Sequence, residues 1–171
     1  MDAGVVPPDE LVTTGTEQEV LAGFLELYRG ILPRKLARLT DEDARRPLVA
    51  SGTTLLGVVK HLASVEREWF GWIFAQRPPA ELGLPTPGDG WPVGPQDTVD
   101  RVIADYQTAC AESRAAVEGH GLDETVPHDR LGQVSLRWIL VHMIEETARH
   151  AGHADILREQ TDGATGFDQA G

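Results

Sequence analysis

A segment near the C-terminal end of the chain carries residue types whose spacing could bind a metal ion. Glu146 and His150 are four residues apart in a helical pattern, so they share one face of a helix, which advances about 100° per residue. The same face carries the apolar stripe Leu136, Ile139, Leu140, Met143, Ala154 and Leu157. Because an unpaired buried carboxylate is costly, Glu146 must be paired, protonated or bound to a metal.

A third metal ligand would come from another helix, because helix bundles build such sites from facing side chains. His61 is the candidate, since an imidazole beside a carboxylate and a second imidazole is a typical zinc ligand. It lies at the edge of an apolar face made by Leu55, Val58, Leu62, Val65, Trp69 and Ile73. Two alternatives stay open: Glu146 and His150 could form a buried ion pair, and His61 could be a hydrogen-bonded core histidine.

Other ionisable residues flank these positions. His142 and His153 fall at the edge of the apolar stripe, where each could hydrogen-bond the backbone or a neighbouring helix. Glu145 and Arg149 are expected to point away from the stripe toward solvent. The positions near Glu146 and His150 therefore offer several candidate proton carriers.

Four segments with helical periodicity must position these residues. We expect them over residues 16–32, 54–75, 97–119 and 135–159, with no strand between them. Amphipathic helices with mostly short links predict an all-α fold, an antiparallel four-helix bundle with a long loop between the second and third helices.

Capping residues mark where the helices begin. Thr16 and Glu19 form a capping box, and Asp97 and Ser135 are expected to be N-caps of the third and fourth helices. Pro33 should kink or interrupt the first helix, because it has no backbone N–H and clashes with the preceding turn.

The remaining segments are rich in proline, glycine or polar residues. Residues 78–96 form a loop that is long for a compact domain, and its Trp91 could cover a pocket or anchor the loop. We expect flexible tails over 1–15 and 161–171, and one bundle domain over 16–160.

Composition excludes some classes of function. The 171-residue chain has a formal net charge of −12, which argues against nucleic acid and anionic membranes as partners. It contains no apolar run of roughly 18 residues and its start does not resemble a secretion signal, so a cytoplasmic location is expected. The single cysteine, Cys110, is interpreted as a core residue and not a nucleophile.

Two segments carry a family resemblance. Residues 57–70 and 142–155 resemble the DinB/YfiT-like superfamily, in particular its actinobacterial branch of mycothiol-dependent S-transferases and maleylpyruvate isomerase. The resemblance implies a DinB-like four-helix bundle whose metal ligands match His61, Glu146 and His150. Many members have histidine at the position of Glu146, and glutamate there agrees with the mycothiol-dependent isomerases.

The resemblance also implies a chemistry. A divalent ion, with zinc expected first and nickel or manganese as alternatives, would bind mycothiol or a similar thiol through sulfur, and the thiolate would attack an electrophile. His153, Glu66 or His142 could relay the proton, and His153 could instead be an alternative ligand or contact a ligand. Arg158 could bind a substrate carboxylate, although a surface charge at a helix end is the simpler interpretation.

Other functions stay open at this point. The same open metal site could activate water in a hydrolase, which would need no thiol. The bundle could also be a non-catalytic stress protein that binds a metal or a ligand. A homodimer is expected from the family resemblance, and the excess of arginine over lysine suggests an actinobacterial origin.

Overall fold

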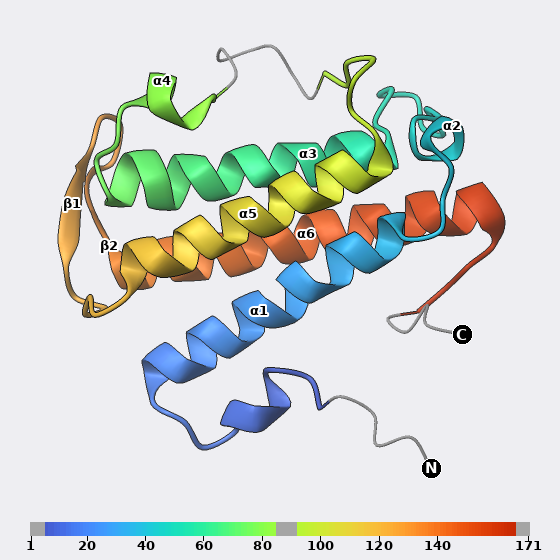
Figure 1. The fold of residues 1–171 in the computed structure, drawn as a ribbon. Coiled ribbons are helices and arrows are strands. Elements are labelled where there is room, and N and C mark those ends of the chain that lie inside the picture. The colour runs from blue at the N-terminus through green and yellow to red at the C-terminus, as the bar shows by residue number, and fades with distance from the viewer. Residues whose placement is uncertain (1–5, 85–91, 167–171) are drawn as a thin grey trace.

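The computed structural model describes residues 6–84 and 92–166, and these residues are mostly helical (Figure 1). The helices are η1 (Glu10–Val12), α1 (Glu17–Leu36), α2 (Asp41–Ala44), α3 (Leu55–Glu66), the π-helix η2 (Arg67–Phe74), α4 (Pro79–Leu82), α5 (Val99–Val117) and α6 (Leu136–Asp162). The prediction of helices is confirmed. The prediction that no strand separates them is wrong, because β1 (Thr125–His128) and β2 (Gly132–Ser135) pair as an antiparallel hairpin.

Two of the three expected helix starts are confirmed. Thr16 and Glu19 form the capping box of α1, and the side chain of Ser135 accepts a hydrogen bond at the start of α6. The N-cap of α5 is Thr98 and not Asp97. Asp97 instead binds Lys60, with 2.7 Å between the Lys60 Nζ and the Asp97 Oδ2.

The first helix does not end at its proline. α1 continues through Pro33 to Leu36, which corrects the expected interruption. Pro33 removes one backbone donor, but its own carbonyl still accepts from the Ala37 N–H at 3.0 Å. The last turn also buries Leu32 and Leu36 completely, and this packing outweighs the loss of one hydrogen bond.

The order of the long helices in space differs from the simple antiparallel arrangement. In Figure 1, α1 and α6 run in the same direction, and α3 and α5 run together in the opposite one. Ion pairs between parallel neighbours include Glu17–Arg137 and Lys35–Asp155 for α1 with α6, and Arg67–Asp105 for η2 with α5, while Asp97, just before α5, pairs with Lys60 of α3. The described residues just before α5 lie beside α3, where Asp97 pairs with Lys60, so α5 begins level with α3 and runs in the same direction.

Buried apolar side chains fill the space between these helices. One group includes Leu32, Leu56, Leu62, Tyr106 and Leu157, and a second includes Leu25, Phe70, Leu136, Ile139 and Met143. The apolar stripe predicted for α6 is confirmed as core, and so is the burial of Cys110. Burial raises the pKa of the Cys110 thiol to about 12, which keeps it protonated and unreactive near neutral pH.

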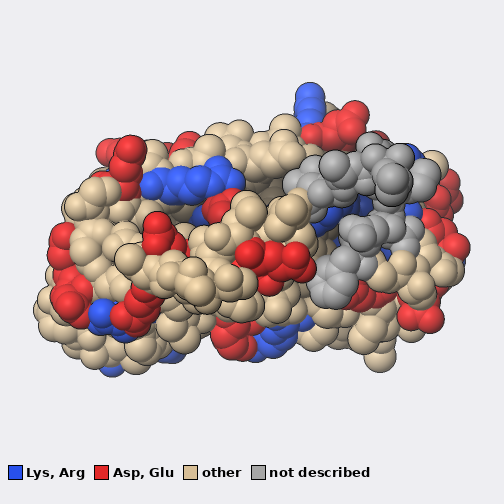
Figure 2. Space-filling view, turned by 90° about the horizontal axis from the view of Figure 1, so that it is seen from below, with Lys and Arg blue, Asp and Glu red and all other residues tan. Residues whose placement is uncertain are grey.

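The described surface carries charges of both signs. On the face in Figure 2, acidic and basic side chains lie among uncharged ones, and the described lysines and arginines there form no continuous basic surface. Within residues 6–84 and 92–166, no helix is long and apolar enough to span a membrane. The proposed lack of nucleic-acid partners and the cytoplasmic location remain predictions.

A buried ion pair connects α1 to the end of α3. The Arg29 Nε and Nη2 bind the two carboxylate oxygens of Glu66 at 2.8 and 2.5 Å, and Glu66 is 1% exposed. Burial disfavours the charged form of Arg29, but the attraction of the Glu66 carboxylate favours it more strongly, so the pKa of Arg29 is raised. Glu66 was one candidate for proton relay, and the structure shows both of its oxygens bound by Arg29 inside the core.

Replacing Glu66 should therefore affect stability. Glu66→Gln removes the buried charge that compensates Arg29, and we expect the free energy of unfolding to fall by about 3 kcal/mol. The loss should not be larger, because Arg29 keeps its ion pair with Glu26. Urea unfolding followed by circular dichroism measures it. The matched control is Glu112→Gln, whose partner Arg67 lies 3.7 Å away at the surface and whose cost should stay under about 1 kcal/mol. Equal, small losses in both variants would contradict the structural role of Glu66.

Candidate metal centre

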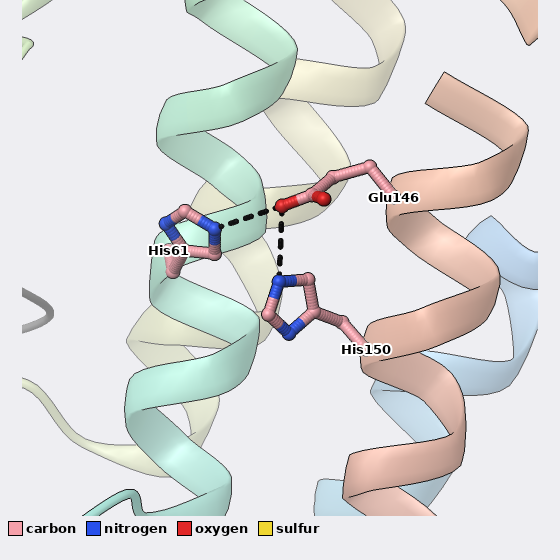
Figure 3. Close-up of side chains that lie close together, drawn as sticks. All are labelled: His61, Glu146 and His150. Carbon is pink, nitrogen blue, oxygen red and sulfur yellow. Dashed lines mark hydrogen bonds and ion pairs between the residues drawn. The ribbon is translucent and has the colours of Figure 1, made fainter. Parts of the chain in front are cut away.

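The three predicted metal ligands converge between α3 and α6 (Figure 3). His61 projects from α3 toward α6, where Glu146 and His150 lie one turn apart and face it. The Glu146 Oε1 lies 3.3 Å from the His61 Nε2 and 3.0 Å from the His150 Nε2. The donor atoms of all three residues lie within 4.8 Å of one another. The structure thus brings His61 to Glu146, which lies 85 positions further along the sequence.

Burial keeps both imidazoles neutral. His150 is 4% exposed and Glu146 8%, while His61 is partly buried. Burial lowers the pKa of His61 to about 4, with His150 and Arg149 adding to the effect. Burial likewise lowers the pKa of His150 to about 4, and Arg149 contributes. Near neutral pH each ring therefore carries one protonated nitrogen and one lone pair that can bind a metal.

The donor set fits a divalent ion. Two imidazole nitrogens and one carboxylate oxygen are typical ligands of catalytic zinc, and three protein ligands leave positions open for a substrate. Nickel and manganese accept the same atoms. The alternative of a simple ion pair between Glu146 and His150 is weakened, because a neutral imidazole cannot compensate the carboxylate charge.

Arg149 contacts the centre from the solvent side. Its side chain is 54% exposed, as expected, but its Nη2 turns back and binds the second carboxylate oxygen of Glu146. The expectation that Arg149 points away from the site is therefore wrong for its charged end. The contact holds the Glu146 side chain with Oε1 directed toward the two histidines.

His153 lies next to His150 on the following turn of α6. The Nδ1 atoms of the two rings are 3.4 Å apart, and His153 is exposed. If the His150 Nε2 lone pair binds a metal, its Nδ1 carries the proton and can donate it to the His153 Nδ1. The structure thus places His153 where it can orient a ligand.

His142 occupies a different environment. Its ring lies 4.4 Å from that of Trp69 and stacks on that of Trp138 at 5.2 Å. Burial lowers the pKa of His142. His142 is one turn before Glu146 on α6, and its ring contacts are with the two tryptophans.

Arg158 belongs to the fold and not to the site. It is 5% exposed, and its Nη1 donates to the Lys35 and Ala37 carbonyls at 2.8 and 3.0 Å. Both carbonyls lie at the C-terminal end of α1. The Arg158 Nη2 also forms an ion pair with the Asp162 Oδ2 at 2.8 Å. The substrate-binding hypothesis and the surface interpretation are both corrected, because Arg158 fastens the end of α1 to α6.

Two hollows near the centre were missed by sequence reasoning. One, of about 280 Å³, lies beside His153 and is bordered by Thr53 and Leu157. The other, of about 450 Å³, lies between η2 and the β1–β2 hairpin and is bordered by Trp69 and Trp72. The hairpin and the π-helix that shape the second hollow left no clear periodic signal. Trp91, expected as a cover or anchor, falls outside the described residues.

Comparisons with known proteins agree with this arrangement. A family model described as mycothiol-S-transferase matches residues 20–163, a range that includes all three converging residues. No curated protein matches the chain significantly. A solved structure described as the conserved protein of locus from Enterococcus faecalis has a TM-score of 0.65 and 16% sequence identity. That likeness covers 87% of this chain and 99% of the other, and it shows a shared fold.

The centre predicts one bound divalent ion per chain. Protein purified without an affinity metal and supplied with zinc should retain near-stoichiometric zinc after desalting, measured by mass spectrometry. His150→Ala should lose it, because two ligands hold an ion much more weakly than three. His120→Ala is the matched control, since His120 pairs with Glu124 in an exposed segment. Stoichiometric zinc that survives in His150→Ala would place the metal elsewhere.

His153 and His142 should differ in their effect on the ion. We expect His153→Ala to weaken zinc binding about tenfold or more, because His150 would lose the partner that orients it. His142→Ala should change the affinity by less than about threefold, since its ring contacts are with tryptophans. Competition with a chromogenic chelator measures both, and equal effects would refute the distinction.

Proposed function

The chain belongs to the mycothiol-S-transferase family, and we propose that it transfers a low-molecular-weight thiol, mycothiol or a close relative, to an electrophilic substrate. The observation that carries this proposal is the convergence of His61, Glu146 and His150 on one point between α3 and α6. Zinc is the ion we expect there, with nickel or manganese as alternatives. A divalent ion held by these residues supplies a Lewis acid that favours the deprotonated form of a thiol.

The residues around the centre have separate tasks in this proposal. His61 and His150 offer neutral nitrogens, while Glu146 adds one negative charge that Arg149 partly balances. His153 holds the ring of His150 and, being exposed, can pass the thiol proton to solvent. Cys110 takes no part, because it is buried and protonated. The nucleophile must therefore come from a co-substrate.

The hollows beside the centre suit a reaction of two substrates. One borders His153, and the other borders Trp69, which contacts His142. Two separate spaces, each bordered by a residue next to the centre or in contact with its neighbours, would let a thiol and an electrophile approach it together. A hydrolase would need room for one substrate and a water molecule, so this arrangement favours transfer.

The test is an assay of thiol transfer. With zinc-loaded protein, the thiolate of mycothiol should replace the chloride of a chromogenic chlorodinitroarene, and absorbance follows the thioether that forms. His150→Ala should lower the initial rate about 100-fold or more, because the group that supplies the chemistry is lost. His120→Ala, the exposed control, should keep the rate within about twofold.

Two outcomes would overturn the proposal. Turnover of ester or amide substrates without any thiol would indicate the hydrolase. Absence of turnover with every thiol tested (mycothiol, cysteine and glutathione), from protein that binds one equivalent of metal, would indicate a non-catalytic metal-binding protein.

A further inference from the structure

The larger hollow has a lining that is unusual for a small protein surface. It measures about 450 Å³, and Trp69 and Trp72 from the η2 segment form an aromatic wall. Trp72 is 38% exposed, so its ring is accessible to a ligand in the hollow. The hairpin forms the opposite side through His128, Asp129 and Arg130.

The polar groups of this hollow are mixed in kind. Glu68 and Asp129 bring carboxylate oxygens, which accept hydrogen bonds, and Arg130 brings a guanidinium, which donates them. The His128 Nδ1 accepts from the Arg130 backbone N–H at 3.2 Å, which leaves the His128 Nε2 as a donor. Both donors and acceptors therefore lie beside the aromatic wall.

The hollow lies near the metal centre. Glu68 follows His61 by two helical turns, about 10 Å along the axis, and it interacts electrostatically with His61 and His128. On the other side, the ring of Trp69 contacts that of His142, one turn before Glu146 on α6. A ligand that fills the hollow can thus extend an arm of about 10 Å to the centre.

This chemistry matches a polyhydroxylated ring compound. Each hydroxyl both donates and accepts hydrogen bonds, so it can use the carboxylates and the guanidinium alike. The apolar face of a saturated ring packs on an indole, and the aromatic wall supplies that surface. We infer that this hollow binds the glycosyl part of the thiol co-substrate, with its sulfur arm directed to His61, Glu146 and His150. This inference rests on the proposed function and adds the place of one substrate.

An anionic ligand fits the hollow less well. Glu68 and Asp129 would repel the carboxylate of an acidic electrophile, and Arg130 balances one of them. The smaller hollow beside His153 is bordered by Val49, Ile156 and Leu157 and has no tryptophan, so it lacks the wall for a sugar ring. The larger hollow is therefore assigned to the hydroxyl-rich partner.

The first experiment uses no catalysis. The sulfur-free pseudo-disaccharide glucosaminyl-inositol is titrated into the zinc-loaded full-length protein by calorimetry. We expect saturable binding that Trp72→Ala weakens about tenfold, because the aromatic wall is lost. Phe24→Ala, an exposed aromatic residue of α1 outside the hollow, is the matched control and should leave binding unchanged. Circular dichroism verifies that both variants are folded.

The second experiment measures steady-state kinetics with two thiols. Trp72→Ala should raise KM for mycothiol about tenfold with kcat nearly unchanged, while kcat/KM for N-acetylcysteine, which has no glycosyl group, should stay the same. A merely structural defect would lower the rate with both thiols.

The two proposals fail in different ways. Fragment binding that depends on Trp72, without any thiol transfer, would support the hollow and overturn the transferase. Thiol transfer with no fragment binding and an unchanged KM for mycothiol in Trp72→Ala would overturn the hollow and leave the transferase standing. Tighter binding of an aromatic carboxylate than of the fragment, lost in Arg130→Ala, would also overturn the inference.

Discussion

The need to compensate the buried carboxylate of Glu146 determines the rest of the site. α6 carries Glu146 in its core stripe, where an uncompensated charge would be costly. Its Oε1 contacts two imidazoles that burial keeps neutral, so these rings bring lone pairs and N–H groups but no charge. Arg149 balances the charge from a half-exposed position, where water weakens the interaction. A divalent ion between the three donors would satisfy both the carboxylate and the lone pairs, and this physical argument favours a metal over an ion pair.

The order of the helices in space brings His61 to the buried carboxylate of Glu146. In a bundle with only short links, consecutive helices are neighbours, and the second and fourth long helices lie diagonally across the core. Here the connection before α5 ends beside Lys60 of α3, so α5 runs parallel to α3 and α6 becomes an antiparallel neighbour of α3 (Figure 1). His61 then faces Glu146 and His150 across one interface. The sequence predicted that this connection is long, but it did not predict that α5 would therefore run parallel to α3.

Local spacing predicted the site better than it predicted the supporting contacts. The pair Glu146 and His150 followed from helical geometry alone, and the face that carries His61 followed from periodicity. The bonds of Arg158 to the end of α1, and of Glu66 to Arg29, depend on which helices become neighbours, and no period in the sequence encodes that. The hairpin was not predicted because each of its strands has four residues, too few for a pattern of alternating polar and apolar residues to be recognised.

The π-helix is the departure with the largest consequence for the surface near the centre. A period of 3.6 residues places Trp69 in the core stripe, but η2 bonds the Ala75 N–H to the Phe70 carbonyl, five residues earlier. In this segment Phe70, Ile73 and Phe74 are buried, and Trp69 is half-buried at the border of the core. There its ring contacts those of His142 and His128, one from α6 and one from the hairpin. Trp69 of this irregular segment thus borders the larger hollow and also contacts the helix that carries two of the metal ligands.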